Sequence, residues 1–226
     1  MMCKNRRYLP QLAAIVLVFT MLFPLLSGCG AESADPSNDK ALSDPASFPP
    51  VNEDGFIVIT MPITLLGGTP ANELAQQQEA KTASMSEQEI AQLSWTKLLA
   101  NEDGSLDYYF TPEQFERTKA AAYAAGQLID SATNTYPAPY IKQAEYTDID
   151  ENGVPWGLMV LVDGEEYTKF QLYNSYYVTL SPAVYLGMFQ IFSGVSGDEW
   201  SVHVTVKDAT SDEVISESDF PTREGA

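Results

Sequence analysis

The sequence predicts an α+β fold, in which an antiparallel sheet of hairpins has helices packed on one face. Three observations support this class. Asp-Gly and Asn-Gly turns separate short apolar runs, as in β-hairpins. Thr-Pro and Ser-Pro pairs precede segments with helical spacing of apolar residues. A late segment alternates between apolar and polar residues, as a strand with one buried face does.

The first expected elements are a strand and one or two helices. Residues 56–61, FIVITM, predict a strand, because a run rich in β-branched residues lies between a turn and Pro62. Residues 70–93 are rich in Ala, Gln and Glu and predict one helix or two. Ser84 or Ser86 would cap the second helix.

A hairpin and a longer helix follow. Residues 95–100 and 105–111 predict paired strands, because the sequence NEDG between them favours a tight turn. Thr111 and Gln114 have the spacing of a capping box, and a proline occupies the first helical position between them. We expect this helix to run to about Ala132.

The second half predicts another hairpin, two helical pieces and a final hairpin. Strands are expected near 140–149 and 154–162, joined by the sequence DENG. The next segment is helical in two pieces, the second capped at Ser181 and ended by Gly194. The alternation around residues 200–207 then predicts a strand that pairs with residues 213–218. The polar side of that strand suggests that the uncovered face of the sheet meets water.

The N-terminus has the layout of a secretory signal. A basic head containing Lys4, Arg6 and Arg7 precedes residues 9–26, which carry no charge and are mostly apolar. A permanent transmembrane helix is the competing interpretation, because such a helix needs about 20 apolar residues. The basic head would lie on the cytoplasmic side in either case.

The residues that end this apolar run favour cleavage and lipidation. Leu26, Ser27, Gly28 and Cys29 resemble the lipobox of bacterial lipoproteins. The resemblance implies that the Cys29 sulfur receives a diacylglyceryl group and that a signal peptidase recognises residues 26–28. Two acyl chains on one residue give stable membrane attachment. We therefore expect a protein held in the cell membrane by the lipid on Cys29, on the extracellular face.

The remainder divides into a tether and one domain. Residues 1–28 would be the signal peptide, and residues 29–50, rich in Ala, Ser, Pro and Asp, would form a flexible tether after the lipidated cysteine. Residues 51–226 would form a single α+β domain. Cys3, the only other cysteine, would leave with the signal, so we expect neither disulfides nor cysteine-based metal sites in the domain.

The net charge of the chain restricts the classes of partner that it can bind. The chain has 31 acidic and 12 basic residues and a formal net charge of −19. Nucleic-acid binding is not expected, because it requires basic patches that neutralise phosphate. A strongly acidic exterior is usually a solubility feature, and it also attracts cations or basic partners.

No metal, cofactor or catalytic residue is predicted. His203 is the only histidine and lies on the polar side of a predicted strand. Residues 148–153, DIDENG, match the first half of a calcium loop, but Met159 occupies the twelfth position, where such a loop needs a bidentate glutamate. A hairpin turn explains the same residues without an ion.

Aromatic residues between 173 and 192 give the only candidate ligand site. Tyr173, Tyr176 and Tyr177 are its candidate ligand-binding residues. Tyr185, Met188, Phe189 and Phe192 have helical spacing, which favours a core face for those four residues.

The order of these motifs resembles a family of uncharacterised lipoproteins of Gram-positive gut bacteria. The resemblance rests on the lipobox and acidic tether, the NEDGS hairpin at 101–111, the helix at 185–195 and the hairpin at 202–215. It implies the fold rather than an activity, and no catalytic residues follow from it.

Two functions remain open from the sequence. The first is a non-enzymatic surface domain that binds a peptide, a glycan, a protein or another envelope component. The second is a carboxylate-dependent envelope hydrolase, which would need two acids in one cleft, one of them with a raised pKa. A solute-binding lipoprotein of two α/β lobes is disfavoured, because one domain of this length is too small for two lobes.

Overall fold

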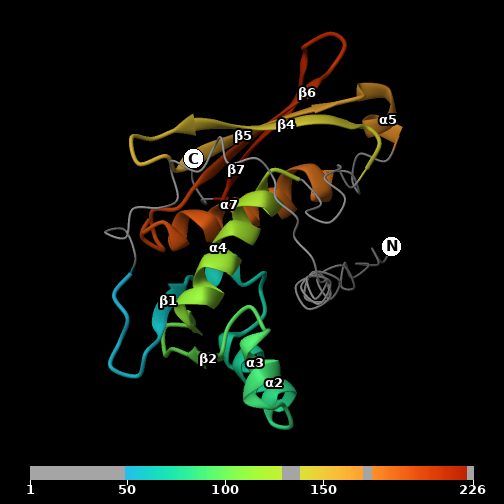
Figure 1. The fold of residues 1–226 in the computed structure, drawn as a ribbon. Coiled ribbons are helices and arrows are strands. Elements are labelled where there is room, and N and C mark those ends of the chain that lie inside the picture. The colour runs from blue at the N-terminus through green and yellow to red at the C-terminus, as the bar shows by residue number, and fades with distance from the viewer. Residues whose placement is uncertain (1–48, 129–137, 170–174, 223–226) are drawn as a thin grey trace, which may run out of the picture.

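The computed structural model describes residues 49–128, 138–169 and 175–222, and its helices and strands form an α+β fold (Figure 1). The predicted fold class is therefore confirmed. The predicted signal peptide, the lipobox residues Leu26, Ser27, Gly28 and Cys29, and almost all of the tether lie outside the described residues.

The first sheet has three antiparallel strands. They are β1 (Ile57–Met61), β2 (Lys97–Ala100) and β3 (Leu106–Phe110), with β3 in the middle. Alternate residues of β1 and β3 are buried, so one face of this sheet lies against the core. The predicted first strand and the predicted hairpin of residues 95–111 are both confirmed.

Short helices connect β1 to β2. A 3₁₀ turn, η3 (Ile63–Leu65), is followed by α2 (Ala71–Thr82) and α3 (Glu87–Ala91), which lie at the end of the molecule far from the second sheet (Figure 1). Ser86 caps α3 through a capping box with Glu89, which confirms one of the two predicted caps. Helix α2 has polar residues on most of its surface, and only Ala71 is fully buried.

The long helix α4 (Pro112–Gly126) begins where the sequence predicted, with a capping box between Thr111 and Gln114. It ends at Gly126, so the expected extension to about Ala132 is wrong. The reason is the backbone conformation of Leu128, whose φ of 58° is left-handed and has no place in an α-helix. Leu128 is nonetheless buried, so burial of its side chain offsets the unfavourable backbone.

The second sheet has four strands in the order β4-β5-β6-β7. They are β4 (Ile141–Ile149), β5 (Pro155–Val162), β6 (Val202–Asp208) and β7 (Val214–Phe220). The β4–β5 and β6–β7 pairs are antiparallel hairpins, as predicted, but β5 and β6 are parallel. The expected single antiparallel sheet is thus two sheets, one with a parallel pair.

The connection between β5 and β6 explains the parallel pair. It contains α5 (Gly164–Lys169), a π-helical turn η4 (Tyr176–Leu180) and α7 (Ser181–Phe192). A crossover that carries helices returns the chain to the same end of the sheet, so the next strand runs parallel. Ser181 does not cap α7, since the helical backbone continues into α7 from η4. Gly194, with a φ of 95°, follows the end of α7 as predicted.

Helix α7 is buried on almost every side. Ten of its 12 residues are buried, and it contacts β1 of the first sheet, β5 and β6 of the second, and α4. Figure 1 shows α7 and α4 between the four-stranded sheet and β1. A helix that is apolar all round is expected only where protein surrounds it. Neither α7 nor any other helix within the described ranges is long and apolar enough to span a bilayer.

Three phenylalanines from three elements meet beside α7. Phe110 of β3, Phe115 of α4 and Phe192 of α7 contact one another edge to face, with ring centroids 5.7–5.9 Å apart. All three are at most 1% exposed. They therefore hold the first sheet, α4 and α7 in one core.

Candidate functional site

The predicted ligand-binding tyrosines lie just before α7. Tyr176 and Tyr177 begin the π-helical turn η4, and both are half-buried. Their rings contact each other edge to face, with centroids 5.4 Å apart. Tyr173 lies outside the described residues. Single π-helical turns are rare and are frequent at functional sites, so the backbone here gives the two tyrosines a second reason for interest.

The large side chains of α7 that have helical spacing lie in the core, as the sequence predicted. Tyr185, Met188, Phe189 and Phe192 are buried and belong to the core. Burial raises the pKa of the Tyr185 phenol, and Tyr176 nearby raises it further. Partial burial also raises the pKa of Tyr176. Both phenols therefore stay protonated at neutral pH and are able to donate hydrogen bonds.

A second group of aromatics joins this segment from α4 and β4. The ring of Tyr123 on α4 lies 4.9 Å from the ring of Phe189 and 4.9 Å from that of Tyr146 on β4. The Tyr146 hydroxyl donates a hydrogen bond to the Tyr123 carbonyl, and burial, followed by the neighbouring Tyr123, raises the pKa of Tyr146. Tyr123 is 36% exposed, so part of this group faces solvent.

The two groups form one continuous set of rings. Phe189 follows Tyr185 by four residues, so the two side chains lie on one face of α7. Tyr185 in turn lies close enough to Tyr176 for ionised Tyr176 to raise the pKa of Tyr185. We call the set the aromatic band; it consists of Tyr123, Tyr146, Tyr176, Tyr177, Tyr185 and Phe189. Sequence reasoning found its α7 side and missed Tyr123 and Tyr146, because the sequence does not reveal which strand crosses α4.

Gly126 makes room for the aromatic band. A methyl group at this position would overlap the Tyr146 hydroxyl and would lie 3.4 Å from the Leu186 nitrogen. We expect Gly126→Ala to lower the free energy of unfolding by about 1–2 kcal/mol, although alanine is the better helix former. In a Tyr146→Phe background the same change should cost less or stabilise the protein, since the overlapping atom is gone. Urea denaturation of wild type, the two single variants and the double variant measures the coupling between Gly126 and Tyr146. Additive changes in the free energy of unfolding would contradict the overlap.

His203 lies on the solvent side of the second sheet, as predicted. Its side chain is 43% exposed. Its Nδ1 lies 2.7 Å from the Asp219 carboxylate on the neighbouring strand β7, and its Nε2 lies 3.9 Å from Glu217. These contacts link β6 to β7 across the sheet surface.

The half calcium motif forms a hairpin turn. One Asp150 carboxylate oxygen accepts hydrogen bonds from the Asn152 and Val154 nitrogens, and these backbone bonds lower the pKa of the carboxyl group. Gly153 has a φ of 79°, which the turn between β4 and β5 requires. Within the part of the chain that the structure describes, no group of three or more His, Cys, Asp or Glu residues is arranged to hold a metal ion.

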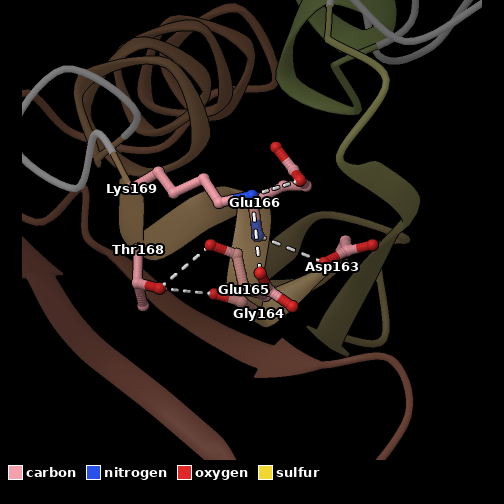
Figure 2. A network of polar contacts seen from close by, with 6 residues as sticks. All are labelled: Asp163, Gly164, Glu165, Glu166, Thr168 and Lys169. Carbon is pink, nitrogen blue, oxygen red and sulfur yellow. Dashed lines mark hydrogen bonds and ion pairs between the residues drawn. The ribbon is translucent and has the colours of Figure 1, made fainter.

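Polar residues also gather where β5 leads into α5 (Figure 2). This is the carboxyl end of the parallel pair, the place where ligands bind in many α/β sheets. Here the groups bind one another: Asp163 accepts from the Glu166 nitrogen, and Lys169 forms ion pairs with Glu165 and Glu166. Asp208, at the end of β6, accepts from the Gly164 nitrogen. The network fixes the start of the crossover.

The carboxyl groups bear on the hydrolase hypothesis, which needs an acid with a raised pKa. Among the described residues, four carboxyl groups have a displaced pKa, and all four are lowered by hydrogen bonds from nearby backbone or side-chain groups. They are Glu89, Asp103, Asp150 and Asp208. Each lies at a helix cap or a turn, so its hydrogen bonds stabilise local structure.

Comparison of the chain with protein-family models, with curated proteins and with solved structures finds no match.

Proposed function

We propose that this chain is a lipid-anchored lipoprotein of the extracellular surface, of the Gram-positive family that its motifs resemble. Its domain would bind a peptide, a glycan or another envelope component without catalysis. The observation that carries the anchor is the sequence Leu26-Ser27-Gly28-Cys29 directly after an uncharged apolar run with a basic head. A diacylated cysteine would hold the domain at the membrane, and residues 30–50 would let it stand clear of the lipid.

The aromatic band supports the binding part of this proposal. Tyr176, Tyr177 and Tyr123 each combine a partly exposed ring with a hydroxyl group that can form hydrogen bonds. Tyrosine offers a large contact area at a low cost in conformational entropy, so it is frequent in binding surfaces. The π-helical turn under Tyr176 and Tyr177 supports the same location.

The anchor is tested by replacing Cys29. In a Gram-positive host, the natural protein should fractionate with membranes, and mass spectrometry should find a diacylglyceryl group on an N-terminal Cys29. The Cys29→Ala variant should lose the modification completely, because only the thiol accepts the lipid. Cys3→Ala is the matched control and should change nothing. An unmodified Cys29 in the natural protein, or an intact leader, would overturn the anchor.

The binding surface is tested by a thermal-shift panel of cell-wall saccharides, muropeptides and unstructured peptides. A true ligand at about 100 times its Kd should raise the Tm by about 5–10 °C. The Tyr176→Ala/Tyr177→Ala variant should lose this shift. Tyr109→Ala, at a half-buried tyrosine of the first sheet, should keep it. A panel that leaves the Tm unchanged, or equal shifts in both variants, would contradict a binding site at these tyrosines.

A carboxylate-dependent hydrolase remains the alternative proposal. It requires release of a product from envelope substrates, which a binding domain does not produce. Chromatography of cell-wall fragments incubated with the protein separates the two proposals.

A further inference from the structure

Lys119 differs from the basic residues whose charges are paired with carboxylates or carbonyl groups. It is half-buried on α4, and its ammonium forms no hydrogen bond or ion pair with any residue that the structure describes. The ammonium lies 5.6 Å from the centroid of the Phe189 ring. By contrast, Lys169 and Lys207 form ion pairs with carboxylates, and Arg117 donates to carbonyl groups of the α3 region.

The partly buried surroundings of Lys119 destabilise the charged form of its side chain. Removal of water from the ammonium lowers the pKa of Lys119, and the charge of Glu116 one turn earlier opposes this only in part. The chain has 31 acidic residues, yet none of those described lies within ion-pair distance of this lysine. A carboxylate supplied from outside would compensate the charge.

The same surface offers aromatic rings next to the cation. Tyr123 follows Lys119 by four residues on α4, so both side chains lie on one face of the helix. Tyr123 is 36% exposed and contacts Tyr146 and Phe189. A cation, exposed ring surface and phenol hydroxyl groups thus lie together where α4 meets α7 and β4.

We propose that Lys119, Tyr123 and Tyr146 form a binding site for a saccharide that bears one carboxylate. The ammonium binds the carboxylate, and the tyrosine rings pack against the C–H face of the sugar. The site lies at the α4 end of the aromatic band, and the inference rests on the proposed binding function.

The charge of the whole chain selects among anionic ligands. With a formal net charge of −19, the protein repels any partner with many negative charges. A single carboxylate in contact with Lys119 gains from the local ion pair, while the remaining charges of the protein act on it through screening solvent. Sugars suit the ring surface because they combine an apolar face with hydroxyl groups that tyrosine can bind.

The experiment compares two sugars that differ by one group. N-acetylmuramic acid is N-acetylglucosamine with an added lactyl ether, which carries the carboxylate. Saturation-transfer NMR on the mature lipidated protein in detergent measures both dissociation constants. The acidic sugar should bind about tenfold more tightly, as a charge-assisted hydrogen bond predicts. Lys119→Gln should remove this difference and leave the neutral sugar unaffected.

Three further variants complete the design. Lys81→Gln, at an exposed lysine of α2, is the matched control and should retain the tenfold preference. Lys119→Arg should restore most of it, and Tyr123→Ala should weaken both sugars. Equal binding of the two sugars by the natural protein, or an unchanged preference in Lys119→Gln, would overturn the proposal. N-acetylglutamate binding as tightly as the acidic sugar would replace the saccharide with an acidic peptide.

Failure of this inference is distinguishable from failure of the proposed function. If neither sugar binds while another member of the thermal-shift panel does, the saccharide site is wrong and the binding function stands. If no panel member binds, both are wrong. The acylation of Cys29 is measured separately and depends on neither result.

Discussion

Replacing Phe192 by alanine is expected to lower the free energy of unfolding by about 3–5 kcal/mol. Phe192 is 1% exposed and its ring contacts Phe110 and Phe115, so the truncation would leave a cavity where α7 meets α4 and the first sheet. Because these three elements share the contact, no single one can relax to fill the space. Urea denaturation followed by far-UV circular dichroism measures the loss.

Phe56→Ala is the matched control for this prediction. Phe56 is half-buried just before β1 and contacts only Tyr109 among the described rings. The same truncation there should cost about 1 kcal/mol, as for an ordinary partly exposed site. An equal loss at the two positions would mean that the three phenylalanines are not the centre of the core.

The second large effect is expected at Gln190, a fully buried amide on α7. Its Nε2 donates to the carbonyls of Pro155 and Ser201, each at 2.8 Å, and its Oε1 accepts from the Ser201 nitrogen at 3.1 Å. Gln190 thereby joins the first residues of β5 to the start of β6. Gln190→Leu keeps the approximate volume but leaves those backbone groups unpaired, which should cost about 2–4 kcal/mol. Gln77→Leu, on the exposed side of α2, should change stability by less than about 0.5 kcal/mol.

Gln190→Glu adds a pH dependence that distinguishes lost hydrogen bonds from lost packing. Burial would raise the pKa of the new carboxyl group above its unfolded value of about 4.3. The folded state therefore favours the protonated carboxyl group. Below about pH 4.3, the unfolded pKa, the stability of the variant should be closest to that of wild type. The variant should lose stability as the pH rises through the folded pKa. A difference from wild type that stays constant between pH 4 and pH 7 would contradict the buried network.

Local features of this fold were predictable from the sequence, because neighbouring residues determine them. The capping boxes that start at Ser86 and Thr111, and the glycine turns at Gly104 and Gly153, depend on a few adjacent side chains. Each hairpin pairs strands that a short turn joins, so its antiparallel direction follows from the turn.

Features that depend on distant contacts were not predictable. The parallel β5–β6 pair is set by the path of the crossover, and the division into two sheets is set by α7 lying between them. The end of α4 follows from the left-handed Leu128, a residue that has no intrinsic preference for that conformation. Tertiary packing overrides local propensity at these places.

The candidate site shows the same division. Tyr176 and Tyr177 are adjacent in the sequence and were found from it. Tyr123 and Lys119 come from α4, and only the fold brings them beside Phe189 and brings Tyr146 of β4 beside Tyr123. Their ordinary helical and strand spacing gives no sign of this meeting.

The central position of α7 has a consequence for how the chain acquires its fold. The strands β1 to β3 and helix α4 are synthesised first, but part of the cover of the sheet's apolar face comes from α7, late in the chain. Until Phe192 has been synthesised, the core of the first sheet and α4 is incomplete and stays open to proteases and chaperones. The fold should therefore be complete only when about five-sixths of the polypeptide exists, and fragments that stop before residue 181 should not be stable.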